Sequence, residues 1–391
     1  MLSDEFLPEL RVRRQALQRL LQREGVDGLW VSSNVNLYYL SGRVFSGHIY
    51  LPAEGELLFF VRRPVGLGGD GVHYVRKPEE APALMTAAGV AMPRVLMLES
   101  DSVPYSEYMR YEKLFGRPEI RNGSAVLREA RAVKTPREIA MIRRSGERHA
   151  EVYRTIPSLY RPGMTDLGLS IEIERQSRLH GSLGIFRIAG QSMEIFAGSV
   201  LAGDNADAPS PYDFAMGGGG LDRSIPVGAD GTVLCEGMSV MVDVGGNFTG
   251  YMTDMTRVFS VGRLPDEAYR AHRVALDMQH EMAAMARPGT PAADIYNLCR
   301  EMAVAAGLGE YFMGHRQQAG FVGHGVGIEI NEAPVLAPRS RDVLAEGMVF
   351  AFEPKFVIPG TGAVGIENTF AVTDGGVEKL TICEEEIVSL G

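Results

Sequence analysis

The sequence predicts an α+β protein of two domains, with the boundary between residues 131 and 132, and three observations carry this expectation. The chain has 391 residues, and a typical domain has about 100–200. Over residues 1–131, helical patterns alternate with short apolar runs, as in an α/β domain. After Gly181 the pattern changes to strands and glycine loops, which indicates a second domain over residues 132–391.

The first domain is expected to begin with a helix. Leucines recur at helical spacing from Leu10 to Glu24, and Gly25 follows as a stop signal. Short apolar runs bounded by Gly, Pro or Asn then predict strands. These runs are residues 28–33, 48–52, 56–61 and 94–100.

Helices are also expected at the start and in the middle of the second domain. Thr135 followed by Pro136 predicts a capped helix start, and helical patterns continue to about Leu179. One more helix is predicted over residues 265–286, where Ala, His and Met side chains form a stripe. Such a stripe is typical of a buried core face.

The composition argues against several classes of function. With 39 Lys and Arg against 49 Asp and Glu, the formal net charge is −10, so no nucleic-acid partner is expected. The three cysteines are widely spaced and suit a reducing compartment. The N-terminus lacks an apolar signal region, and no uncharged apolar stretch approaches the length of about 18 residues that spans a membrane. We therefore expect a cytoplasmic protein with no membrane partner.

The first candidate site is a predicted hairpin with one acidic residue in each strand. An apolar run that contains Asp243 is followed by a glycine turn and by a second run that contains Asp254. A turn centred between Phe248 and Thr249 would place the two carboxylates directly opposite each other on one face. Like charges at this spacing are destabilising unless a positive charge lies between them.

A second predicted hairpin, near the C-terminus, repeats this arrangement. A turn centred on Gly360 places Glu353 opposite Glu367 in apolar strands. Burial is therefore expected, and a buried carboxylate needs a partner. One interpretation is that each acid pairs with a nearby cation, such as Arg257 or Lys355. Two matched acidic pairs in one domain instead favour a bound metal cation.

His324 is the fifth candidate ligand. Glycines on both sides of it allow the backbone to come close to whatever the imidazole contacts. A lone His in an apolar run is usually a hydrogen-bonded core residue, but the two acidic pairs favour a metal ligand. Oxygen ligands with one imidazole suit Mn, Co or Fe better than a structural zinc site. Four carboxylates can hold two ions about 3.5–4 Å apart.

These motifs resemble metallopeptidase family M24, which has the pita-bread fold and contains aminopeptidase P, prolidase and creatinase. The five ligand motifs of the family occur here in the family's order. They are Val242-Asp243-Val244-Gly245, Gly250-Tyr251-Met252-Thr253-Asp254-Met255-Thr256-Arg257, Gly323-His324-Gly325-Val326-Gly327, Glu353-Pro354 and Ile366-Glu367-Asn368. Residues 36–42, Asn-Leu-Tyr-Tyr-Leu-Ser-Gly, resemble the creatinase/prolidase N-terminal domain.

The resemblance implies a creatinase-like α/β N-terminal domain followed by a pita-bread metallohydrolase domain. It implies two divalent ions (Mn, Co, Fe or Zn) bridged by Asp243 and Glu367, with Asp254 completing one shell and His324 and Glu353 the other. A metal-activated hydroxide would attack a peptide or amide carbonyl, as in Xaa-Pro aminopeptidases and dipeptidases. Glu353, as proton shuttle, and His324 are the implied catalytic residues. Family members are commonly dimers, so a homodimer that acts on short peptides or small molecules is expected.

The chain departs from the family at residues that handle substrate. Ser210 and Gly320 stand where the family often has His, and Gly365 stands where it commonly has Arg. Asn331 replaces the usual proton donor, and an amide donates a hydrogen bond but no proton near neutral pH. These departures put Xaa-Pro cleavage in question and leave the metal ligands intact.

Residues 210–223 look like an insertion with four consecutive glycines. They form either a flexible surface loop or a segment in which Tyr212, Asp213 or Arg223 supplies polar groups at the mouth of the active site. His315 is a further candidate for this task. The candidate substrate-binding residues are thus Asn331, Ser210, Tyr212 and His315.

Two functions other than peptide hydrolysis can be weighed against the same residues. The departures suit an enzyme of the same fold that acts on a small non-peptide metabolite, as creatinase, ectoine hydrolase and a sulfoniopropionate lyase do. A non-catalytic binding domain is disfavoured, because such domains normally lose the metal ligands and all five are present here.

Overall fold

The chain folds into two compact units. The computed structural model describes residues 6–190, 193 and 195–390. The units are Met1–Arg131 and Ala132–Gly391. Among the helices of the described residues, none combines the length and the apolar character that spanning a membrane requires.

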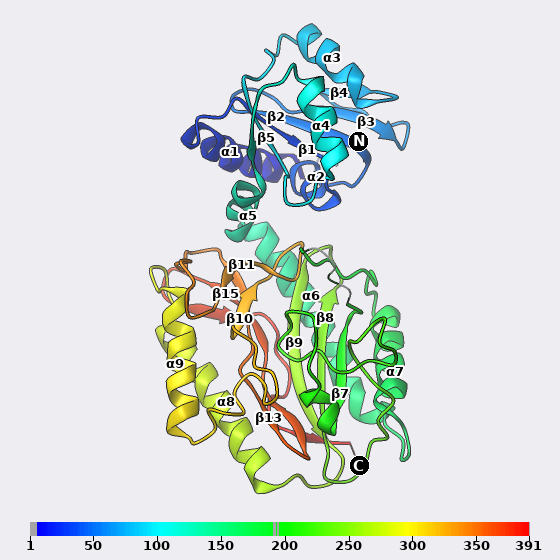
Figure 1. Ribbon diagram of the computed structural model, residues 1–391, viewed down its shortest axis with the longest axis vertical. Coiled ribbons are helices and arrows are strands. Elements are labelled where there is room, and N and C mark those ends of the chain that lie inside the picture. The colour runs from blue at the N-terminus through cyan, green and yellow to red at the C-terminus, as the bar shows by residue number, and fades with distance from the viewer. Residues whose placement is uncertain (1–5, 191–192, 194, 391) are drawn as a thin grey trace. The chain divides into compact units, whose positions relative to one another are not determined.

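A mixed six-stranded sheet forms the centre of the first unit (Figure 1). The strand order is β4-β3-β2-β1-β5-β6, and β1 pairs antiparallel with β2 and parallel with β5. The strands are β1 (Gly28–Val31), β2 (Ser46–Pro52), β3 (Leu58–Arg63), β4 (Val72–Tyr74), β5 (Val95–Leu98) and β6 (Glu119–Asn122). The four predicted strands correspond to β1, β2, β3 and β5, so these predictions are confirmed.

Helices cover this sheet and bury its large side chains. The predicted first helix is α1 (Leu7–Arg23), which buries Leu10, Leu17 and Leu21. Trp30 of β1 packs in one core cluster with Met85 of α3 and Tyr111 of α4. The other helices of this unit are α2 (Asn34–Ser41), a short 3-10 helix (Pro78–Glu80), α3 (Ala81–Ala87), α4 (Tyr105–Leu114) and α5 (Ser124–Ala132).

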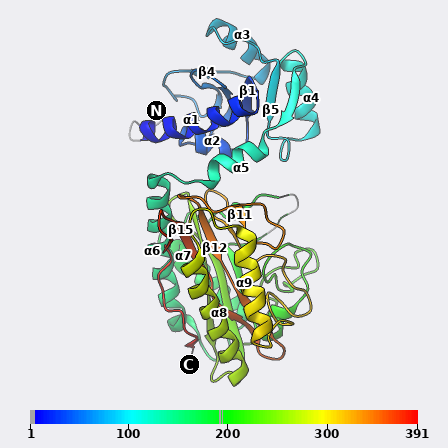
Figure 2. The ribbon, with the colours of Figure 1, turned by 90° about the vertical axis from the view of Figure 1, so that its left-hand side faces the viewer.

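The second unit consists of two halves, each with a sheet and two helices (Figures 1 and 2). In the first half, α6 (Pro136–Leu159) and α7 (Asp166–Leu179) pack on a sheet of order β17-β9-β8-β7. Its strands are β7 (Gly198–Ala202), β8 (Ser239–Asn247), β9 (Met252–Ser260) and β17 (Val388–Ser389), with a 3-10 helix (Gly203–Asp207) after β7.

In the second half, α8 (Asp266–Met285) and α9 (Ala292–Ala305) pack on a sheet of order β11-β10-β12-β15-β16. A hairpin of β13 (Lys355–Ile358) and β14 (Gly362–Gly365) extends from this half. The sheet strands are β10 (Gly323–Gly325), β11 (Glu332–Val335), β12 (Val349–Phe352), β15 (Asn368–Val372) and β16 (Val377–Lys379). The two halves together form the predicted α+β fold.

The predicted helix start at Thr135 and the predicted buried face of the helix over residues 265–286 are confirmed. The side chain of Thr135 accepts from the amide of Glu138, and the Glu138 carboxylate accepts from the amide of Thr135, which closes a capping box at the start of α6. The predicted helix over residues 265–286 is α8, and its stripe, including Met278 and Met282, is buried in the core.

The register of the first hairpin differs from the prediction. Asp243 pairs with Thr256, and Asp254 pairs with Gly245. The turn lies one residue later than expected because Gly250 adopts a left-handed conformation, φ +86°, and its amide donates to the side chain of Asn247. The predicted direct opposition of Asp243 and Asp254 is therefore wrong. They are diagonal neighbours that still share one face of the sheet.

The register of the second hairpin agrees with the prediction. Phe352 of β12 pairs with Asn368 of β15, and Lys355 of β13 pairs with Gly365 of β14. Glu353 and Glu367 lie between these two pairs, at the point where the hairpin leaves the sheet. The paired strands thus place Glu353 and Glu367 opposite each other along the hairpin.

Candidate metal centre

Five side chains from both halves of the second unit line one cavity of about 350 Å³. Asp243 lies on β8, Asp254 on β9 and His324 on β10. Glu353 lies between β12 and β13, and Glu367 lies between β14 and β15. These are the five predicted metal ligands, and the fold brings all of them together.

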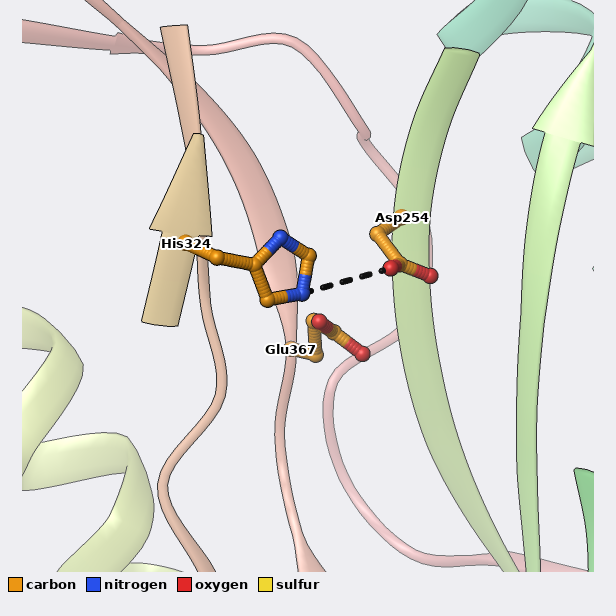
Figure 3. Close-up of side chains that lie close together, drawn as sticks. All are labelled: Asp254, His324 and Glu367. Atoms are coloured by element: carbon orange, nitrogen blue, oxygen red, sulfur yellow. Dashed lines mark ion pairs between the residues drawn. The ribbon is translucent and has the colours of Figure 1, made fainter. Parts of the chain in front are cut away.

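The five groups form two sets that share Glu367. In one set, Asp254, His324 and Glu367 each offer an atom within 4.8 Å of the others (Figure 3). In the other set, Asp243, Glu353 and Glu367 do the same. Nε2 of His324 lies 3.7 Å from Oδ2 of Asp254 and 3.5 Å from Oε1 of Glu353. Both sets have donor atoms of the kinds that Mn, Fe or Co prefer.

Buried neighbours hold these side chains in place. The Thr256 hydroxyl donates to Oε2 of Glu367 at 2.6 Å. On the neighbouring strand, the Thr369 hydroxyl donates to the backbone oxygen of Asp254 at 2.9 Å and accepts from its amide at the same distance. Nδ1 of His324 lies 3.2 Å from the backbone oxygen of Gly325, which directs Nε2 toward the cavity.

Arg257 connects the centre to the C-terminal segment. Its side chain is buried, with 3% of its surface exposed. Nη1 donates to the backbone oxygen of Glu367 at 2.8 Å, and Nη2 donates to Oδ1 of Asn368 at 2.9 Å. Nε donates to the backbone oxygen of Glu384 at 2.5 Å. The C-terminal segment that contains Glu384 is therefore hydrogen-bonded to the same guanidinium that supports Glu367. This segment ends in β17, which pairs with β9.

Burial makes the acidic groups favour a nearby positive charge. Burial raises the pKa of Asp254 well above its usual value, and the charges of Asp243 and Glu353 raise it further. Burial and the charge of Asp254 likewise raise the pKa of Glu367. A cation placed between these carboxylates would reverse both effects.

Lys355 places one positive charge inside this centre. Its Nζ lies 2.6 Å from Oε2 of Glu353, 2.9 Å from Oδ2 of Asp243 and 3.4 Å from Oε2 of Glu367. Burial alone would lower the pKa of Lys355, but the three carboxylates outweigh burial and raise it well above its usual value. Sequence reasoning named Lys355 only as a possible partner of one acid. A strand places residues two apart on one face, and this spacing from Glu353 was the available signal.

Of the four candidate substrate-binding residues, only Asn331 lines the cavity. Its side chain accepts from the amide of Ala189 and donates to the backbone oxygen of Ala189, each at 2.8 Å. Asn331 therefore fastens the cavity wall around residue 189. Its amide is already engaged there by two hydrogen bonds.

The other three candidates lie outside the cavity lining. Ser210 and Tyr212 line a separate hollow of about 50 Å³. Nδ1 of His315 lies 3.0 Å from Oδ2 of Asp207. Asp213, the alternative named for the insertion, does line the main cavity.

Two irregular segments form the apolar wall of the cavity, and only the second of them, the insertion, was expected from the sequence to lie near the active site. The first contributes Phe186, Ile188, Met193 and Ile195, and the second contributes residues 213–216 of the insertion. The glycines of the insertion approach other backbone closely, since a Cβ at Gly218 would lie 2.4 Å from the backbone oxygen of Gly228. The glycine run of the insertion is therefore packed against other backbone, whereas Leu221, Asp222 and Arg223 are exposed.

The glycines beside His324 are required by close strand packing. A Cβ at Gly325 would lie 2.1 Å from the backbone oxygen of Ala333. We expect Gly325→Ala to push β10 from β11, to destabilise the protein by about 1–3 kcal/mol and to weaken metal binding by displacing His324. Denaturant unfolding and metal titration measure the two effects.

Gly320→Ala is the matched control for this substitution. Nothing lies within 4 Å of a Cβ built there. Its stability is expected to change by less than about 0.5 kcal/mol. Equal effects of the two substitutions would contradict the role given to Gly325.

Comparison with protein families gives two matches that together cover most of the chain. Residues 140–374 match the model of metallopeptidase family M24. Residues 13–133 match that of the creatinase/prolidase N-terminal domain. The first match contains all five side chains of the centre.

Individual relatives match over nearly the full length. The chain is 27% identical over 388 residues to the uncharacterized peptidase YqhT of Bacillus subtilis, covering 97% of this chain and 100% of the relative. It is 25% identical over 375 residues to an Xaa-Pro dipeptidase of Pyrococcus horikoshii, covering 94% and 96%. A solved Xaa-Pro dipeptidase of Bacillus anthracis has the same fold, with a TM-score of 0.79, 24% identity and coverage of 97% and 99%.

Proposed function

Because this chain belongs to metallopeptidase family M24, a family of metal-dependent peptidases, we propose that it hydrolyses short peptides of the Xaa-Pro type. The observation that carries this proposal is the convergence of Asp243, Asp254, His324, Glu353 and Glu367 on one cavity. The relatives named as Xaa-Pro dipeptidases support the substrate class. The cavity of about 350 Å³ is of a size suited to a small ligand.

In this proposal the set of Asp254, His324 and Glu367 holds a divalent ion. Its two carboxylates and one imidazole fit Mn, Co or Fe, and Zn is also compatible. The bound metal would supply Lewis acidity, which polarises a carbonyl and lowers the pKa of water. Two ions, as the resemblance implies, would need both sets, and a second ion would have to displace the Lys355 ammonium from the other set.

The protein groups around this set have defined tasks. Oε1 of Glu353 lies 3.5 Å from Nε2 of His324 and lines the cavity. There it is placed to take a proton from the attacking water and to deliver it to the leaving amide nitrogen. The apolar wall around Phe186 and Ile188 would exclude bulk water and contact the substrate side chains.

A peptide panel tests the proposal. We expect the protein, loaded with Mn or Co, to cleave at least one Xaa-Pro dipeptide or tripeptide in preference to the matched Xaa-Ala peptide. Product amino acids are quantified by chromatography. Failure of the metal-loaded protein to cleave any member of the panel would exclude the peptidase assignment.

A second candidate is hydrolysis of a small amide metabolite, and one observation favours it. Among the described residues that line the cavity there is no Arg or Lys to receive the C-terminal carboxylate of a dipeptide. A substrate without that carboxylate would suit this lining. A metabolite that raises the melting temperature when dipeptides do not would support this candidate.

Three further expectations belong to the same proposal. We propose that the units Met1–Arg131 and Ala132–Gly391 are the N-terminal and catalytic domains. The family resemblance supports a homodimer, and light scattering on a sizing column that gives the monomer mass would contradict it. The cysteines at 235, 299 and 383 are free, which supports a cytoplasmic location.

A further inference from the structure

The Lys355 ammonium lies at the centre of the set formed by Asp243, Glu353 and Glu367. Each of these three carboxylates has an oxygen within 3.4 Å of Nζ. The side chain of Lys355 has 0% exposure. An ammonium has three N–H donors, which is one for each carboxylate of the set.

A metal ion and this ammonium would compete for the same oxygens. A divalent ion in an oxygen site lies about 2.0–2.6 Å from its ligands. An ion at that distance from the oxygens of Asp243 and Glu353 would lie in the space that Nζ takes, and two cations so close repel strongly in a buried site. The donor set therefore fits a metal ion only if Lys355 leaves.

The hairpin of β13 and β14 leaves space for the side chain of Lys355. It pairs with Gly365 across β13 and β14. A Cβ on Gly365 would lie 3.2 Å from Cγ of Lys355 and 2.4 Å from the backbone oxygen of Pro354. The φ of Gly365 is +149°, which a residue with a side chain rarely adopts. The absence of a side chain at residue 365 thus makes room for the lysine stem.

The other set is arranged differently. His324 contributes an imidazole, and its Nε2 faces Asp254 and Glu353 across distances of 3.7 and 3.5 Å. A gap of this size between donor atoms is too long for a direct hydrogen bond. The imidazole of His324 and the carboxylates of Asp254 and Glu367 lie close together, and each offers a ligand atom within 4.8 Å of the others (Figure 3).

We propose that this protein binds a single divalent ion, at Asp254, His324 and Glu367, and that the Lys355 ammonium replaces the second ion of the centre. The inference rests on the proposed function only in that it assumes a metal requirement. It makes the centre mononuclear, with a fixed positive charge from the protein beside the ion.

Metal stoichiometry tests this inference directly. Chelator-treated protein is dialysed against excess Mn(II), and bound Mn per chain is measured by elemental analysis. We expect one ion in the wild type and two in Lys355→Met, because the substitution frees the second set without changing its carboxylates. Electron paramagnetic resonance should give the spectrum of isolated Mn(II) in the wild type and of a spin-coupled pair in the variant.

Two control substitutions keep the stoichiometry interpretable. Lys379→Met removes another lysine that is paired with an acid, Glu385 at 2.6 Å, and should keep one ion. Lys355→Arg retains the cation and should also bind one. If Lys355→Met fails to fold, Asp243→Asn in the wild-type background takes its place. Asp243 is outside the proposed ligand set, so the ion should be retained with affinity changed only several-fold.

The outcomes separate this inference from the peptidase proposal. Two ions in the wild type, none in the wild type, or loss of the ion in Asp243→Asn would overturn the inference. Binding of two ions with cleavage of Xaa-Pro peptides would overturn the inference and leave the function. One ion without any cleavage would leave the inference and overturn the function.

Discussion

Replacing Glu367 with Gln is expected to weaken Mn(II) binding by at least about 100-fold, because loss of a residue that merely supports a metal ligand costs about 10–100-fold. Glu367 belongs to both ligand sets, so no other single substitution removes as much of the centre. The rate of peptide hydrolysis at subsaturating metal should fall by a similar factor. Titration calorimetry and steady-state kinetics measure the two effects.

The same substitution should leave the metal-free protein folded. Burial and the charge of Asp254 disfavour the ionised form of Glu367, so a neutral amide of the same shape removes a repulsion. Glu378→Gln is the matched control, since Glu378 is an exposed acid of β16 that pairs with Arg143 at 2.8 Å. Equal metal affinities of Glu367→Gln and the wild type would refute the assignment of this ligand.

Replacing Lys134 with Met is expected to destabilise the protein by about 3–5 kcal/mol, the usual cost of removing one partner of a buried ion pair. Nζ of Lys134 lies 3.0 Å from Oε2 of Glu332, and both side chains are 1% exposed. The Glu332 carboxylate also accepts from the amides of Ile328 and Glu329. It would remain buried without the ammonium. Denaturant unfolding measures the loss.

Two further variants separate the charge from the packing. In Lys134→Met combined with Glu332→Gln both charges are absent, so most of the lost stability should return. Lys379→Met breaks a pair whose side chains are 32% and 22% exposed, and it should cost no more than about 1 kcal/mol. If Lys134→Met lowers the free energy of unfolding by less than about 1 kcal/mol, this ion pair does not stabilise the turn at Ile328 and Glu329.

The regular elements were predictable because their signals are local. Thr135 and Pro136 mark the start of α6, and apolar runs mark the strands of the first unit. No expectation covered α9, which begins after Pro291 without a capping side chain. The register of the second hairpin was predictable because its turn is centred on Gly360, as expected. The register of the first hairpin depends on the conformation of Gly250, which the residue pattern does not reveal.

The ligand residues were predictable and the rest of the cavity was not. Acidic residues in apolar strands are rare enough to indicate a metal or catalytic site, and the fold brings the four acids close together. The wall residues Phe186, Ile188 and Ile195 lie outside regular elements, so no periodic pattern marks them. The proximity of Lys355 to three acids required knowledge of which strand faces which, because Asp243 is 112 positions away in the chain.

The hydrogen bonds from Arg257 to the backbone of Cys383 and Glu384 make the end of the chain a brace for the catalytic interior. Nicking by a protease near residue 382 would sever that brace while leaving both helical layers and the ligand-bearing strands intact. Such cleavage would first loosen the position of Glu367, and the domain would unfold only later.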